Sequence, residues 1–115
     1  MKRIITNRLY KTADSFVPAA VVEVSDEGLV RNFYTIEGDI PEAEWLGGIL
    51  VMSSQEALSD DVDVIRLANI KQILDILKPD YPDNFPYYVW SVNGIDSKSG
   101  EKVGREVVLK RVEGE

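Results

Sequence analysis

Short hydrophobic runs separated by turn-forming residues dominate the first third of the chain, and this pattern is typical of β-strands. Residues 3–10 form the first such run, which is interrupted at Asn7. Residues 19–24 and 29–36 form the next two, and both are rich in residue types that favour strands. The segment Ser-Asp-Glu-Gly at 25–28 lies between them and ends in a glycine that can adopt a positive φ angle. The sequence therefore predicts a β-hairpin at this point.

Three further strands are predicted in the rest of the chain. The longest uncharged run, Trp-Leu-Gly-Gly-Ile-Leu-Val-Met at 45–52, predicts a buried strand, and the glycine pair at 47–48 indicates a bulge or bend. An aromatic strand is predicted at 87–92 and a last strand at 105–112. Residues 97–102 contain the small and basic residues of a phosphate-binding loop but lack the glycine spacing of a P-loop, so we expect a turn there.

One amphipathic helix is predicted at about 62–77. Its hydrophobic positions recur at helical spacing and form a broad stripe of Ile65, Leu67, Ile70, Ile73, Leu74 and Leu77. Ser59, Asp60 or Asp61 would cap its start, and Pro79 would end it. The sequence predicts no second long helix for this stripe to pack on, so the stripe must cover the sheet or meet another molecule.

Length and composition fit a single domain, residues 1–115. Strands at both ends with a helix between them predict a mainly β (α+β) fold, a small β-sandwich-like domain with one principal α-helix. The chain contains no His and no Cys. These absences remove the imidazole base, the Ser-His and Cys-His nucleophiles, thiolate metal sites and disulfides. We therefore expect no enzyme activity, no catalytic residue, no metal ligand and no cofactor.

Charge is distributed unevenly along the chain, whose net charge is −7. Residues 1–11 hold four basic residues and no acidic one, whereas residues 12–65 hold twelve acidic residues and one arginine. A basic first strand and an acidic middle are expected to lie close together in the fold. The acidic balance argues against nucleic acid or an anionic membrane as a partner. No apolar run has the length of a signal peptide core or a membrane span, so we expect a cytoplasmic location.

Two groups of residues could support a binding site. Asp60, Asp61 and Asp63 could bind Mg²⁺ or Ca²⁺ weakly, but their spacing is not that of an EF-hand loop, and carboxylates also stabilise a helix start. The notable aromatic residues are Trp45, Tyr81, Phe85, Tyr87, Tyr88 and Trp90. On an extended strand Tyr88 and Trp90 share one face. These aromatic residues could fill the core, form an interface or contact a small molecule.

Three segments of the first half follow one another in a recognisable order. They are the opening strand at 2–10, the hairpin at 21–30 with its Asp-Glu-Gly turn, and Glu-Trp-Leu-Gly-Gly-Ile-Leu-Val at 44–51. This order resembles the N-terminal part of the amidohydrolase (metallo-dependent hydrolase) superfamily, in which a small β-sandwich flanks a catalytic barrel. Those enzymes continue into Pro-Gly and a His-X-His metal motif, whereas Met-Ser-Ser-Gln-Glu follows here at 52–56. The resemblance therefore implies the flanking composite domain with the catalytic barrel absent.

A flanking domain without its barrel would expose an apolar surface, and such a surface usually finds a partner. The sequence therefore predicts a non-catalytic domain that acts through protein association, as a homodimer or with an unidentified protein. The expected interface residues are Trp45, Leu46, Ile49, Tyr88 and Trp90. The alternative is a small-ligand or carbohydrate binding module that uses the aromatic strand at 85–92. A metal-assisted hydrolase that relies on carboxylates is contradicted by the lack of His ligands.

Overall fold

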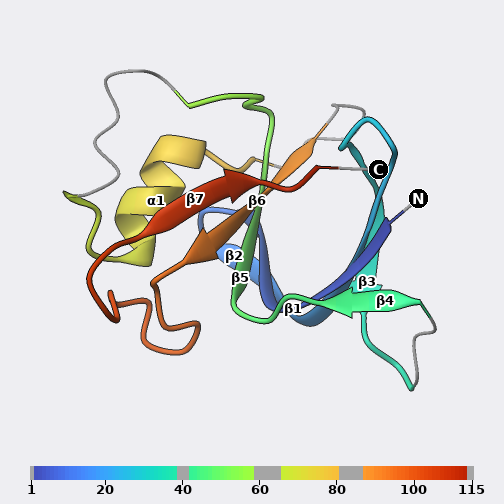
Figure 1. The fold of residues 1–115 in the computed structure, drawn as a ribbon, viewed down its shortest axis with the longest axis horizontal. Helices are drawn as coiled ribbons and strands as arrows, with labels where there is room; N and C mark the ends of the chain where they lie inside the picture. The colour runs from blue at the N-terminus through green and yellow to red at the C-terminus, as the bar shows by residue number, and fades with distance from the viewer. Residues whose placement is uncertain (1, 39–41, 59–65, 81–86, 114–115) are drawn as a thin grey trace.

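An antiparallel meander opens the fold (Figure 1). The computed structural model describes the chain outside five short segments, that is, residues 2–38, 42–58, 66–80 and 87–113. β1 (Lys2–Thr12) pairs with β2 (Ser15–Val24), and β2 pairs with β3 (Val30–Thr35). The amide of Gly28 donates to the carbonyl of Ser25 at 2.9 Å, and the φ angle of Gly28 is 85°. The predicted hairpin and its turn are confirmed.

β1 runs through the predicted interruption at Asn7, where it changes neighbours instead of ending. Its first half pairs in parallel with β4 (Ala43–Trp45), and its second half pairs in parallel with β5 (Ile49–Ser53). The glycine pair 47–48 makes the step between β4 and β5, with φ angles of 65° and 60°. The hydroxyl of Thr6 donates to the carbonyl of the second glycine at 3.0 Å and anchors this step. The bend predicted from the glycine pair is therefore confirmed.

Two more antiparallel strands, β6 (Tyr88–Asn93) and β7 (Val108–Arg111), extend the sheet beyond β5. The strand order is β3-β2-β1-β5-β6-β7, with β4 also beside β1. The sheet curls until β3 meets the start of β6, where the amide of Val30 donates to the carbonyl of Tyr87 at 2.8 Å. The mainly β fold is confirmed, and the two layers expected of a sandwich-like domain come from one curled sheet.

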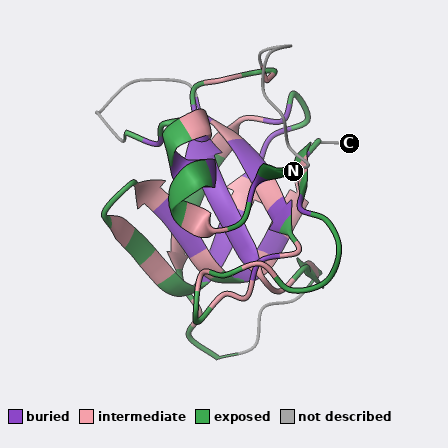
Figure 2. Ribbon diagram, turned by 90° about the vertical axis from the view of Figure 1, so that its left-hand side faces the viewer, coloured by how far each residue is buried: buried purple, intermediate pink, exposed green. Residues whose placement is uncertain are grey.

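Two hydrophobic clusters stabilise this arrangement. One fills the inside of the curl and contains Ile4, Leu9, Ala20, Val22, Val24, Leu50, Met52, Tyr87, Val89 and Val112. The other lies between the outside of the sheet and helix α1 (Ile70–Leu77), and its members include Ile49, Val51, Ile73, Leu77 and Trp90. β5 is buried along its whole length because its residues alternate between the two clusters (Figure 2). This double burial explains its lack of charged residues.

Helix α1 begins later than the sequence predicted, because residues 67–69 are not helical. Asn69 has an extended backbone, and its side chain accepts a hydrogen bond from the amide of Gln72 at 3.1 Å. Such a cap replaces one of the bonds that the first turn of a helix lacks. The amide of Ile70 donates to the carbonyl of Gly100 at 2.8 Å, so the approach to the helix is already paired with another segment. These bonds fix the helix start at Ile70.

The predicted end of the helix is confirmed. Helix α1 stops at Leu77, and Pro79 follows within two residues. The hydroxyl of Ser53 donates to the carbonyl of Leu77 at 2.6 Å, which joins the helix end to β5. The apolar stripe of the helix packs on the sheet, as one of the two predicted possibilities required. The expected caps Ser59, Asp60 and Asp61, and the predicted helical residues 62–65, lie outside the described residues.

Candidate functional site

The outer surface of strands β4, β1, β2 and β3 is the candidate interaction site. Ile4 and Val22 point into the curl, and Phe33 packs against the same inner cluster. Because side chains alternate along a strand, the neighbours of these residues point outward. The pairing aligns the outward residues across the four strands. We call this surface, formed by Arg3, Ile5, Val21, Glu23, Tyr34 and Trp45, the Trp45 face.

An apolar row crosses the Trp45 face from β4 to β3. Trp45 pairs with Ile5, Ile5 with Val21, and Val21 with Tyr34. Trp45 is 62% exposed, whereas Ile5 and Tyr34 are half-buried and Val21 is fully buried. The indole lies beside Gly47, where an added Cβ would be 3.4 Å from its Nε1 atom. The row is therefore continuous in the strand pairing but is interrupted at the surface by the buried Val21, and its most exposed member is also its largest.

A polar cluster borders this apolar row. The Nε atom of Arg3 donates to Oε2 of Glu23 at 3.1 Å, and the hydroxyl of Tyr34 donates to the same oxygen at 3.2 Å. Lys2 and Glu44 form a second ion pair on the opposite side of these strands, because they alternate with Arg3 and Trp45, and their nitrogen–oxygen distance is 3.5 Å. Both pairs join the basic first strand to an acid of the middle segment, so the predicted proximity of the two is confirmed.

The surroundings of the Tyr34 hydroxyl shift its pKa. Loss of hydration raises the pKa of Tyr34 above its ordinary value of 10.0. The hydrogen bond to Glu23 and the negative charge of that carboxylate raise the pKa further, and the positive charge of Arg3 opposes them. At neutral pH the phenol is therefore protonated and available as a donor.

Helix α1 leaves the Trp45 face uncovered. No member of this face belongs to the cluster beneath the helix, and the contacts of the helix with a strand centre on β5. Figure 2 shows α1 over the buried central strands, with its own outward side exposed. The domain thus buries one part of its outer sheet surface and exposes another.

The five interface residues predicted from the sequence do not form one surface. Trp45 and Leu46 are exposed by 62% and 43%, but their side chains alternate, and Leu46 lines a groove near Lys2 and Glu113. Ile49 and Trp90 are only 2% and 5% exposed and belong to the core beneath the helix. Tyr88 is half-buried. Of the five predicted interface residues, Trp45 is therefore the one that lies exposed on the Trp45 face.

Sequence reasoning missed Arg3, Ile5 and Tyr34 as members of this surface. The hairpin turn alone could have placed Tyr34 beside Val21, because a short turn fixes the register of its two strands. The pairing of β1 with β2 and β4 joins segments far apart in the chain, and no local signal specifies it. The Trp45 face is thus a product of long-range strand pairing.

A groove of about 580 Å³ lies beside the aromatic strand. Its lining includes Glu56, Ala57, Leu58, Trp90, Leu109 and Arg111. The indole of Trp90 donates to the carbonyl of Gln55 at 3.0 Å, so its polar atom is already bonded. Arg111 donates to the carbonyl of Glu56 at 3.0 Å, and its guanidinium carbon lies 5.2 Å from the ring centre of Tyr88. Tyr81 and Phe85 lie outside the described residues.

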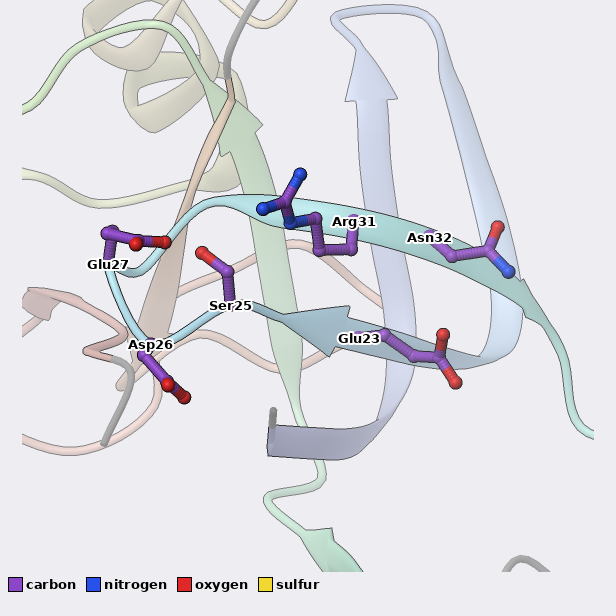
Figure 3. Close-up of a pocket in the computed structure, with 6 residues that line it drawn as sticks. All are labelled: Glu23, Ser25, Asp26, Glu27, Arg31 and Asn32. Carbon is purple, nitrogen blue, oxygen red and sulfur yellow. The ribbon is translucent and has the colours of Figure 1, made fainter.

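The end of the β2–β3 hairpin forms an open acidic pocket of about 480 Å³ (Figure 3). Its lining consists of Glu23, Ser25, Asp26, Glu27, Arg31 and Asn32. The carboxylates of Glu23, Asp26 and Glu27 come from separate positions and do not converge on one point. Within the described part of the chain, no three acidic side chains form a group that could hold a metal ion. The acidic cluster of Asp60, Asp61 and Asp63 lies outside it.

The segment at 97–102 forms a turn, as predicted. The amide of Gly100 donates to the carbonyl of Asp96 at 2.8 Å, and the amide of Lys98 donates to the carboxylate of Asp96 at 2.9 Å. The amide of Glu101 donates to the hydroxyl of Ser99 at 3.2 Å. A phosphate-binding loop must present its amides to a ligand, whereas these amides are bonded within the turn.

Fold and surface together define a mainly β domain with an open sheet face. Comparison with protein-family models, curated proteins and solved structures finds no match to this chain. The resemblance to the flanking domain of amidohydrolases therefore stays a prediction. In the described residues there is no helix of the length and apolarity that crossing a membrane requires.

Proposed function

We propose that this chain is a non-catalytic domain that acts by associating with a second copy of itself through the Trp45 face. The observation that carries the proposal is the 62% exposure of Trp45 beside the half-buried Ile5. The half-buried Ile5 adds to the apolar surface of the indole, and exposed apolar patches mark interaction sites. Large aromatic side chains also dominate the energetics of protein interfaces.

The composition of the chain supports the non-catalytic part of the proposal. It has no His and no Cys, so the imidazole base and the thiolate nucleophile are both missing. The carboxylate nearest the Trp45 face, Glu23, already accepts hydrogen bonds from Arg3 and Tyr34. The resemblance to a flanking domain that lost its barrel would account for an uncovered sheet face.

Sedimentation velocity and native mass spectrometry of the full chain test this proposal. We expect a concentration-dependent dimer, twice the chain mass of 12.9 kDa, and a shift to single-chain mass in Trp45→Ala. Val103→Ala is the matched control, because Val103 is 55% exposed but lies outside the Trp45 face. A wild-type chain that stays at single-chain mass at every concentration would overturn the proposal. So would a Trp45→Ala variant that associates as strongly as the wild type.

The groove beside Trp90 favours a second candidate function, binding of a small ligand or carbohydrate. It is an open, shallow groove of about 580 Å³ that combines an aromatic strand, two leucines and a guanidinium. Native mass spectrometry of gently purified protein would show retained ligand as extra mass on the chain. Titration of Trp90 fluorescence with a panel of monosaccharides, in a Trp45→Phe background, would test carbohydrates directly. An unchanged spectrum across the panel would exclude those sugars.

A further inference from the structure

We infer that a second copy of the chain adds its own β4 to the free edge of β4, antiparallel and about a two-fold axis at Glu44. The inference rests on the proposed function and specifies which part of the Trp45 face meets the partner. Pairing of two edges extends the sheet sideways, so it requires no contact across the curved outer surface. A two-fold axis suits such a pairing, because the same strand then contributes both sides.

The edge of β4 that faces away from β1 has unpaired backbone groups. The amide of Leu46 donates to the carbonyl of Ile5 at 3.0 Å, so Leu46 faces β1. Backbone groups alternate in direction along a strand, so Glu44 also faces β1, whereas Ala43 and Trp45 face away from it. In the described part of the chain β4 pairs with β1 alone. The amides and carbonyls of Ala43 and Trp45 are therefore open to an added strand.

Two large apolar side chains lie exposed on opposite faces of this edge. Trp45 is 62% exposed on the outer face. Leu46 follows it directly, is 43% exposed and points to the inner face. A partner packed on the outer face could cover Trp45 but not Leu46, whereas a strand added at the edge lies beside both. The exposure of both side chains therefore favours edge pairing.

The free backbone groups determine the register of the pairing. An axis at Glu44 places Ala43 opposite the partner's Trp45 on both sides of the axis. Each such pair exchanges both of its backbone hydrogen bonds, so every free group of the edge gains a partner. The small side chain of Ala43 also leaves room for the indole opposite it. An axis at Trp45 would instead place Ala43 opposite Gly47, whose amide already donates to the carbonyl of Ile5 at 3.3 Å.

The two Glu44 side chains face each other at the axis, and Lys2 limits their repulsion. Like charges directly opposite each other destabilise a strand pair. Each Glu44 carboxylate lies 3.5 Å from the Lys2 ammonium of its own chain, so the charges at the axis balance. The edge of β7 offers no such balance, because Lys110 has no ion pair within the described residues.

Amide hydrogen exchange of the wild-type chain tests the pairing directly. The amides of Ala43 and Trp45 should exchange about tenfold more slowly where most chains are dimeric than at a dilution where they are single. Leu109 and Arg111 on β7 are the matched controls, because their amides point away from β6 and have no strand beside them in the described part of the chain. The exchange of these two amides should not depend on concentration.

The outcomes separate this inference from the proposed function. If the wild type dimerises but the amides of Ala43 and Trp45 exchange as fast in the dimer as in the single chain, edge pairing is wrong and self-association stands. If the wild type does not associate, both fail.

Replacement of Leu46 distinguishes edge pairing from packing on the outer face. Leu46→Ala should dimerise about tenfold more weakly than the wild type, because an edge-paired partner covers this side chain. Val108→Ala is the matched control, since Val108 is 42% exposed but lies on β7. A partner on the outer face alone would leave both variants at the wild-type affinity, and that result would overturn the inference.

A single cysteine tests the register. Glu44 and the partner's Glu44 form a pair without hydrogen bonds between them, in which the Cα atoms lie about 4.5 Å apart. This separation is within the range of a disulfide. Because the chain contains no Cys, Glu44→Cys should oxidise in air to a disulfide-linked dimer, whereas Val103→Cys, which is also exposed, should not. Equal linkage of the two variants would overturn the register centred on Glu44.

Discussion

The two tryptophans of this chain are expected to have separate roles, and replacement of Trp90 by alanine gives the larger effect on folding. Trp90 is 5% exposed and belongs to the cluster beneath the helix, opposite Val51 on the neighbouring strand. Removal of a buried tryptophan side chain costs about 3–5 kcal/mol of folding free energy. The carbonyl of Gln55 would also lose its 3.0 Å hydrogen bond, which adds roughly 1 kcal/mol.

This loss is large relative to the whole stability of the domain. A chain of 115 residues has a total unfolding free energy of roughly 6–17 kcal/mol. Urea denaturation followed by circular dichroism measures the change, and a loss of about 4 kcal/mol moves the midpoint by about 2 M urea. Trp90→Phe keeps an aromatic ring in place and should retain most of this stability. Trp45→Ala should shift the unfolding free energy by no more than about 0.5 kcal/mol, because the side chain is exposed.

Protein concentration controls for association in this comparison. Both variants and the wild type must be unfolded at a dilution where the chain sediments at 12.9 kDa, so that coupling to dimerisation is absent. If Trp90→Ala unfolded at the wild-type midpoint, the assignment of Trp90 to the core would be refuted. If Trp45→Ala were as destabilising as Trp90→Ala, the exposed row would be part of the folding core, and the proposed interface would lose its basis.

Two further predictions concern backbone strain and pH. Gly94→Ala should lower the unfolding free energy by about 3 kcal/mol or more, because the φ angle is +91° and a Cβ would overlap the carbonyl oxygen of Glu106. Gly104→Ala, where φ is +84° and the space is open, should lower it by about 1–2 kcal/mol. Thermal unfolding compares the two variants. The raised pKa of Tyr34 implies that its stabilising contribution is complete below about pH 10 and is lost as the pH rises through the folded-state pKa. Tyrosinate absorbance of the wild type minus that of Tyr34→Phe measures this titration, and a Tyr34 pKa at or below 10.0 would contradict it.

Local sequence signals predicted the parts of the fold that local chemistry determines. The Ser-Asp-Glu-Gly turn at 25–28 predicted the β2–β3 hairpin, since the glycine supplies the positive φ angle that the turn needs. The glycine pair at 47–48 predicted the bend between β4 and β5 for the same reason. The uncharged run that follows predicted a buried strand, and β5 is buried throughout. In each case the signal and the structure involve the same few residues.

The helix start and the interface depend on distant segments, and the sequence predictions there were incomplete. The apolar stripe continues through Leu67, which is buried against the helix-side cluster although it is not helical. Its neighbours pair with the segment around Gly100, and no local pattern reports that pairing. Trp90 was assigned to an interface because its strand is aromatic on both faces, yet both faces are covered within one chain. Exposure on a strand depends on what covers it, and that is decided by topology.

The same topology explains why a sheet face stays open in this domain. Six strands lie side by side in the curled sheet, and α1 is eight residues long, which makes it about 12 Å long and about 10 Å wide. At a spacing of about 4.8 Å between strands, such a helix covers the outer surface of about two of them. The remaining strands on the β3 side need polar outward residues or a second molecule. At one level of that surface the outward residues are polar, namely Arg3 and Glu23. At the next level they are Trp45, Ile5 and Tyr34, which are largely apolar. The surface is therefore not polar throughout, and the apolar level is where the partner is proposed to bind.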